Sequence, residues 1–195
     1  MAGMTTRERI VSEADRLFYE RGYEHTSFAE IADAVGISRG NFYYHFKSKD
    51  EILDAVIKRR MTSTSEMLQV WECQSSSPSE RIKSFILIVI RNRAQIILHG
   101  CPVGTLCSEL AKIGHPAQPQ SNQLFSLFRT WLCQQFALLG READADSLAM
   151  HVLAFSQGVA LLAHAFQDKC FVEREAERMC AWLDRVADEA TTKIG

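Results

Sequence analysis

The 195-residue sequence predicts an all-α protein, and three observations support that fold class. Only ten glycines and four prolines are present, so few positions interrupt regular structure. Apolar residues recur at helical spacing along the chain, and no segment of any length alternates as a strand does. Apolar residues make up 47% of the chain and charged residues 24%, which indicates a soluble protein with a sizeable core. We expect two domains, over residues 1–48 and 49–195.

Three short helices are expected near the N-terminus, over residues 5–21, 27–35 and 38–45. The first two each begin with a Thr or Ser followed three residues later by Glu, which is the capping-box spacing. A glycine follows each of them and ends the helix. The second and third helices share an apolar inner face that can bury a small core: Phe28, Ile31, Val35, Ile37, Phe42 and Phe46.

The rest of the chain is expected to be helical as well. A fourth helix follows the capping pair Ser48 and Glu51, and a fifth begins at Pro78 and reaches about His99. A break at Gly100 to Gly104 comes next. The remaining helices are expected over about residues 105–112, 122–139, 143–167 and 171–190.

The N-terminal pattern predicts a helix-turn-helix, in which the third helix enters the major groove of DNA. Its outward face offers donors, acceptors and rings suited to phosphates and base edges: Arg39, Asn41, Tyr43, Tyr44 and His45. Charge adds nothing to this prediction, because residues 1–60 carry ten basic and ten acidic side chains and the whole chain has a net charge of −2. The alternative is a small helical domain whose exposed aromatic rings only pack on their neighbours.

The run from Thr26 to Leu53, above all its segment Phe-Tyr-Tyr-His-Phe-Lys-Ser-Lys at residues 42–49, resembles the DNA-binding domain of TetR-family transcriptional regulators. The resemblance covers about residues 7–55. It implies an N-terminal three-helix helix-turn-helix domain and a C-terminal helical domain for dimerisation and ligand binding. The DNA contacts that it implies are phosphate contacts by Thr26, Tyr43, His45 and Lys49, groove contacts by Ser38, Arg39, Asn41 and Tyr44, and a close backbone approach at Gly40.

A homodimer through the last two helices is expected, because one short recognition helix reads too few bases whereas two, about one turn of DNA apart, read a palindrome. Small side chains in residues 154–163 would allow a second helix to approach closely. Tight packing within one chain is the alternative reading of those residues. The expected function is that of a repressor that binds a palindromic operator and is released by an unknown small molecule. An activator that needs no ligand is a further possibility.

A ligand pocket could be lined by side chains of the C-terminal domain, although each is also an ordinary core residue: Trp71, Phe85, His99, Cys101, Cys107, Phe128, Trp131 and Gln157. Glu109 is a further polar candidate. The helix expected after Cys101 could lower the pKa of a thiol at its N-terminus. A redox- or electrophile-sensing regulator acting through Cys101 and Cys107 is therefore an alternative function, and simple packing of these thiols is the other.

No catalytic site, metal site or cofactor is expected. His99 stands near Cys101 as a base stands near a nucleophile, but no triad motif or phosphate loop accompanies them. His99, Cys101, Cys107 and His115 lack the tight Cys-x-x-Cys pairs of a zinc site. No apolar run approaches the roughly 18 residues that span a membrane, and no secretory signal is seen. We expect a cytoplasmic protein.

Overall fold

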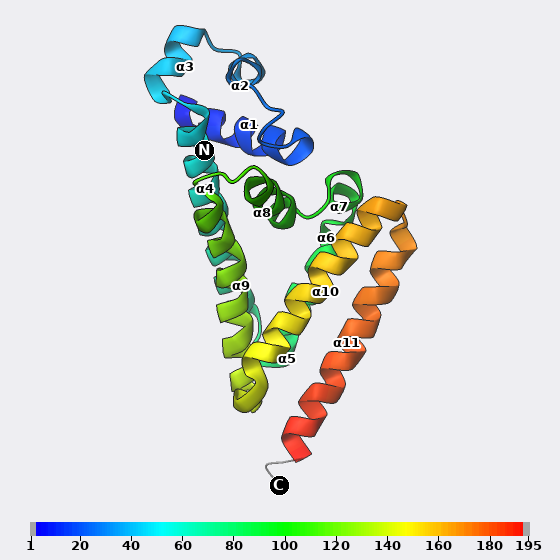
Figure 1. Ribbon diagram of the computed structural model, residues 1–195. Coiled ribbons are helices and arrows are strands. Elements are labelled where there is room, and N and C mark those ends of the chain that lie inside the picture. Colours follow the sequence, from blue (N-terminus) through cyan, green and yellow to red (C-terminus); the bar gives the residue numbers. More distant parts are fainter. Residues whose placement is uncertain (1–2, 193–195) are drawn as a thin grey trace. The chain divides into compact units, whose positions relative to one another are not determined.

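The computed structural model describes the backbone of residues 3–192 and the side chains of residues 3–189. Within that range the chain is helical with short connections and contains no strand, which confirms the all-α prediction (Figure 1). The helices are α1 (Thr6–Arg21), α2 (Phe28–Val35), α3 (Arg39–His45), α4 (Lys49–Gln74), α5 (Pro78–Ile86), α6 (Ile88–Arg91), α7 (Arg93–His99), α8 (Pro102–Lys112), α9 (Gln118–Leu138), the short 3₁₀ helix η1 (Glu142–Asp144), α10 (Ala145–Phe166) and α11 (Lys169–Thr192).

The chain forms two compact units that are interleaved in sequence. The first unit combines the chain up to Ser63 with Pro102–Leu124, and the second combines Thr64–Cys101 with the chain from Phe125 onward. Two contiguous domains were expected from the sequence, with the division between residues 48 and 49. These compact units are defined differently, so that division stays a prediction. What the structure adds is that α8, more than fifty residues beyond α3, belongs to the same unit as the first three helices.

The first unit is built around one apolar cluster to which α1, α2, α3, the start of α4 and α8 all contribute. The local signals act as expected. The Thr5 hydroxyl accepts from the Glu8 N–H and Ser27 caps α2 in the same way through Glu30, so both capping boxes form. The largest fully buried side chains of this cluster are Ile10, Ile31, Phe42, Phe46, Ile52, Leu53 and Leu110.

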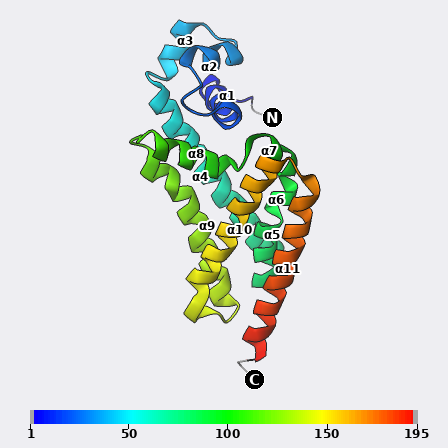
Figure 2. The same cartoon turned by 45° about the vertical axis from the view of Figure 1, so that its right-hand side comes forward.

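The second unit is a bundle in which α10 packs against α7 and α11, and α11 packs against α5 (Figure 2). The helix α10 is long and apolar enough to cross a membrane by length and composition alone. Eight residues of α10 are buried in the unit. Much of its apolar character is therefore that of a helix in the core of a folded domain. Four large apolar side chains of α10, namely Met150, Leu161, Leu162 and Phe166, are exposed and are considered below.

One expected helix is divided. The segment expected to run from Pro78 to His99 forms α5, α6 and α7, with breaks at Leu87 and Asn92. Neither residue is a glycine or a proline, and each still donates its N–H to the carbonyl four residues back, to Lys83 at 2.8 Å and to Ile88 at 3.0 Å. Leu87 keeps right-handed helical angles with ψ of −4°, and Asn92 has ψ of 9°, so the helix is interrupted at both residues while these two bonds remain.

Two later helices begin earlier than expected. The helix expected from residue 105 begins at Pro102, so Gly104 lies inside it, and the helix expected from residue 122 begins at Gln118. In both cases a proline stands in the first turn, where its missing N–H costs no helical hydrogen bond. The break between α7 and α8 is therefore confined to Gly100 and Cys101.

Candidate nucleic-acid interface

The turn between α2 and α3 is fixed by its backbone. Gly36 ends α2 in the left-handed conformation, with φ of 71°, and its N–H donates to the carbonyls of Ala32 and Asp33. The next N–H, of Ile37, also donates to Ala32, at 3.3 Å. From α1, the Arg9 guanidinium donates to the carbonyl of Val35 at 2.6 Å and so satisfies another carbonyl at the end of α2.

Aromatic packing holds α3 against α2. The rings of Phe28 and Phe42 meet edge to face with their centroids 4.4 Å apart, and Phe42 is fully buried. The ring of Tyr43 lies 5.0 Å from that of Phe28. At the end of α3, Phe46 is buried beneath the guanidinium of Arg7, which lies 4.7 Å from the ring centroid. The inner face predicted for this segment is thus confirmed as a packed core.

The outer face of α3 is open to solvent. Ser38 caps the helix by accepting from the Asn41 N–H at 3.3 Å, and the residues from Ser38 to Asn41 are exposed. Tyr43 is 51% exposed and Tyr44 is 78% exposed. An exposed tyrosine of this kind presents both a ring and a hydroxyl to a partner, at a position where packing does not require an aromatic residue.

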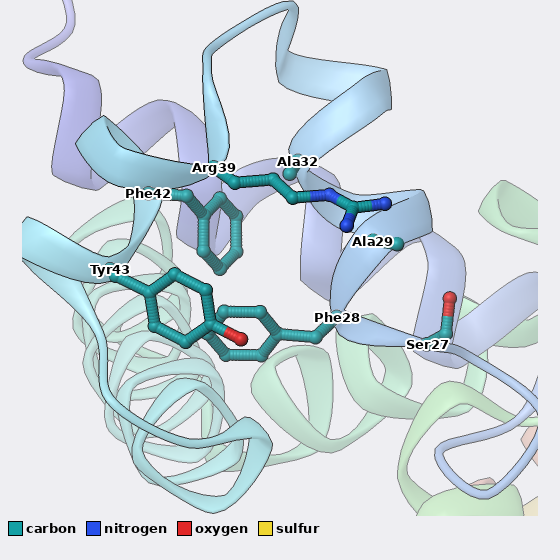
Figure 3. A pocket seen from close by; sticks show the side chains of 7 residues that line it. All are labelled: Ser27, Phe28, Ala29, Ala32, Arg39, Phe42 and Tyr43. Carbon is teal, nitrogen blue, oxygen red and sulfur yellow. The ribbon is translucent and has the colours of Figure 1, made fainter.

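A shallow pocket of about 250 Å³ lies between α2 and α3 (Figure 3). Phe28, Ala29, Ala32 and Phe42 contribute apolar surface to it, while Ser27, Arg39 and Tyr43 contribute polar groups. In Figure 3 the side chain of Arg39 extends across Ala32 towards Ala29, with its guanidinium at the far end. The aliphatic stem can therefore rest on apolar surface while the charged group remains accessible.

Thr26, for which the resemblance implied a phosphate contact, has a buried side chain. The residue is 1% exposed, and its hydroxyl donates to the carbonyl of Gly22 at 2.7 Å. The hydroxyl already serves to close the turn between α1 and α2, and a phosphate contact by Thr26 stays a prediction. In this structure the side chain of Thr26 stabilises the turn that precedes α2.

Lys49 and His45 are half-buried at the two ends of the α3–α4 connection. The Lys49 ammonium donates to the carbonyl of Tyr23 at 3.0 Å and lies 4.2 Å from the centroid of the Tyr23 ring. An ammonium has three N–H groups, so this anchoring leaves it with donor capacity for a phosphate. His45 lies edge-on to the ring of Tyr44.

Several residues that support this interface carry no signal in the local sequence. The hydroxyl of Tyr23 donates to Asp50 at 2.5 Å, and burial together with this bond raises the pKa of Tyr23 above its ordinary value. Arg60 pairs with Asp15 at 2.7 Å and also donates to the carbonyl of Pro102. These contacts join segments between 27 and 45 residues apart, which no spacing rule detects.

Glu109 is a further residue of this kind. Its carboxylate accepts from the N–H groups of Tyr23 and Glu24, each at 2.9 Å. The sequence had suggested it as a polar contact in a ligand pocket, but the structure places it in the first unit against the turn that precedes α2. Sequence spacing could not reveal this role, since the bonded residues are 86 and 85 positions apart.

The residues expected to line a ligand pocket are distributed over both units. Cys107 is buried on α8 in the first unit, whereas the others belong to the second. There, Trp71 and Trp131 are buried with their ring centroids 5.8 Å apart, and Phe85 meets Phe128 edge to face at 5.2 Å. His99, Cys101 and Gln157 are half-buried. Within the described residues, no cluster of three or more His, Cys, Asp or Glu side chains could hold a metal ion.

The buried inner face and the exposed outer face of α3 define a helix-turn-helix protein that binds DNA. Comparison with known proteins agrees with this. The family model described as "Bacterial regulatory proteins, tetR family" matches residues 10–56. The HTH-type transcriptional regulator TtgR of Pseudomonas putida is 42% identical over 164 residues, which cover 79% of this chain and 78% of TtgR. The chain belongs to the tetR family, and it is a DNA-binding transcriptional regulator and not an enzyme.

Two further relatives cover most of the chain. The HTH-type transcriptional repressor DhaR of Mycobacterium sp. (strain GP1) is 25% identical over 171 residues, which cover 83% of each protein. The crystal structure of a TetR transcriptional regulator from Legionella pneumophila superposes with a TM-score of 0.81 at 28% identity, over 95% of this chain and 98% of that one. The likeness therefore extends through both units.

Proposed function

We propose that this regulator is a repressor that binds a palindromic operator as a homodimer and is released from it by a small molecule. The observation that carries the proposal is the outer face of α3, where Arg39, Asn41 and Tyr44 are exposed on a helix whose opposite side is fixed by buried aromatic rings. A rigid support with exposed polar groups is what a base-reading helix requires, because loose side chains would lose entropy on binding.

Nine positions are predicted to meet DNA, and this proposal keeps the eight that are exposed or half-buried, because the side chain of Thr26 is buried. Arg39 and Asn41 read base edges, for which guanine and adenine are their usual partners. Tyr44 approaches the bases, and the backbone at Gly40 approaches the groove. Ser38, Tyr43, His45 and Lys49 complete the contact surface, the last three at phosphates.

Dimerisation is proposed through α10 and α11. On α10 several large apolar side chains are exposed: Met150, Leu161, Leu162 and Phe166, with exposed fractions from 41% to 75%. Gly158 lies on the same helix, and a Cβ atom added there would meet nothing within 4 Å. Packing within the chain therefore does not require a glycine at this position, and an exposed apolar face of this kind favours association with a second copy.

Repression is supported by the name of DhaR, a transcriptional repressor that is similar over 83% of its length. A regulator that binds chromosomal DNA works in the bacterial cytoplasm, and we place this protein there. Release by a small molecule requires that the ligand prefer the state with low DNA affinity. The buried rings of Trp71, Phe85, Phe128 and Trp131 lie in the second unit and are our candidates for the apolar lining of that ligand site.

Selection from a library of random duplexes tests operator binding by the purified full chain. We expect a palindrome whose half-sites are centred about one helical turn apart, roughly 34–36 Å, or a multiple of it. The complex should weaken steeply as salt rises, because phosphate contacts release counterions. Asn41→Ala should relax selection at one base position in each half-site, whereas the exposed Glu66→Gln on α4 should not. Enrichment of no sequence, or of a single half-site, would contradict the proposal.

A reporter gene placed behind the selected sequence then tests repression. We expect expression to fall when the regulator is present and to recover with the cognate ligand. A rise in expression on adding the regulator would show an activator instead.

A further inference from the structure

The turn between α1 and α2 is built around a carboxylate. The N–H of Tyr23 donates to Oε2 of Glu109 and the N–H of Glu24 donates to Oε1, each at 2.9 Å. Both oxygens of one side chain are thus used by two successive backbone amides. Hydrogen bonds to an ionised acceptor are stronger than those between neutral groups.

Gly22 lies next to the same carboxylate. It ends α1 with φ of 90°, a region that favours glycine. A Cβ atom at this position would lie 2.9 Å from Oε1 of Glu109, which is closer than real Cβ contacts, and 3.2 Å from Oε2, which is a tight contact. The absence of a side chain at Gly22 therefore leaves room for the carboxylate of Glu109, a residue of α8.

The opposite side of the turn is held by a cation. The ammonium of Lys49, at the start of α4, donates to the carbonyl of Tyr23 at 3.0 Å. The peptide groups of the turn thus have an anion at their N–H groups and a cation at a carbonyl. The Thr26 hydroxyl closes the turn on itself through the carbonyl of Gly22 at 2.7 Å.

The turn leads directly into the DNA-binding helices. Ser27, the residue after Thr26, is the N-cap of α2, and Phe28 is the first residue of that helix. The ring of Phe28 contacts those of Phe42 and Tyr43 on α3. Because packed cores transmit displacements, a shift of the turn moves Phe28 and with it the helix that faces DNA.

We propose that Glu109 is a positioning residue for DNA binding, which acts through the α1–α2 turn and touches no DNA itself. The inference rests on the operator binding proposed above. If the turn is in its native position only part of the time, the apparent affinity equals the intrinsic affinity multiplied by the fraction of molecules with a native turn. Loss of the carboxylate should therefore weaken DNA binding without removing any DNA contact.

The experiment uses the full-length protein, the selected operator and three variants. Glu109→Ala removes both acceptors, Glu109→Gln keeps one oxygen, and Glu66→Gln makes the same chemical change at an exposed position on α4. Operator affinity is measured by fluorescence anisotropy, and amide hydrogen exchange is followed by NMR. We expect affinity about tenfold lower for Glu109→Ala, as for a turn that is native about one tenth of the time. Glu109→Gln should lie between it and the wild type, and Glu66→Gln should equal the wild type.

Exchange distinguishes positioning from general stability. In Glu109→Ala the amides of Tyr23 and Glu24 should lose protection while the amides in the middle of α1 and α4 keep theirs. Unchanged affinity in both Glu109 variants would overturn the inference, and so would loss of protection throughout the first unit. A wild-type protein that selects no operator would overturn the proposed function, and the inference with it. A wild type that binds and variants that bind equally would refute the inference alone.

Discussion

Tyr44→Ala separates DNA recognition from folding more cleanly than any other substitution on α3. The side chain is 78% exposed, and its one ring contact is edge-on to the neighbouring His45. Exposed substitutions away from special features change the free energy of unfolding by no more than about 0.5 kcal/mol. The variant should therefore fold as the wild type does.

The loss in binding should be much larger. A side chain that contacts a base contributes about 1–3 kcal/mol to affinity and to sequence preference. Since about 1.4 kcal/mol is tenfold in affinity, Tyr44→Ala should bind the selected operator between about fivefold and 150-fold more weakly. Binding to unrelated duplexes should change far less, because phosphate contacts dominate there.

Titration of labelled operator and of a scrambled duplex at several salt concentrations measures both effects, with urea unfolding of the same samples as the stability check. Leu138→Ala is the matched control, because Leu138 is a large apolar residue that is 65% exposed at the end of α9. Operator affinity within twofold of the wild type would refute the placement of Tyr44 at the bases. A loss of several kcal/mol in unfolding free energy would show that the ring is needed for packing instead.

Three other substitutions test the supports of the fold and of the dimer. Arg60→Met should lower the free energy of unfolding by about 1–3 kcal/mol in urea titration, because Asp15 is left without its buried partner; an unchanged midpoint would contradict this. Tyr23→Phe should cost about 1–2 kcal/mol at pH 7 through loss of the bond to Asp50. Because the pKa of Tyr23 is raised in the folded state, the wild type's advantage should be constant below pH 9 and shrink above about pH 10, where the unfolded phenol ionises. Leu161→Glu should shift the protein towards monomer in sedimentation, and an unchanged dimer would exclude this part of α10 from the interface.

The parts of the fold that the sequence predicted are those specified by neighbouring residues. The capping pairs Thr5–Glu8 and Ser27–Glu30 and the helix end at Gly36 formed as expected, because each acts within a few residues. The break at Leu87 was missed because this residue is neither glycine nor proline.

The supports of the site could not be predicted in the same way. The hydrogen bond from the N–H of Tyr23 to Glu109 joins residues 86 positions apart, and the sequence around either residue does not indicate its partner. Thr26 is a second example of a side chain whose partner was not predicted from the sequence. The resemblance implied a phosphate contact for it, and the structure adds that its hydroxyl donates to the carbonyl of Gly22. Long-range partners, and the burial that they cause, appear only once tertiary packing is known.

The contact between Glu109 and the first helices also sets an order of events during synthesis. The residues of α1, α2 and α3 are made first, yet the carboxylate that holds their turn is added 85 residues after Glu24. At about 5–20 residues per second, a ribosome needs about 4–17 seconds for that distance. A nascent chain therefore contains α1, α2 and α3 before it contains the carboxylate that bonds to their turn. In the role proposed for Glu109, full affinity for DNA is reached only after α8 has been translated and has packed against the turn.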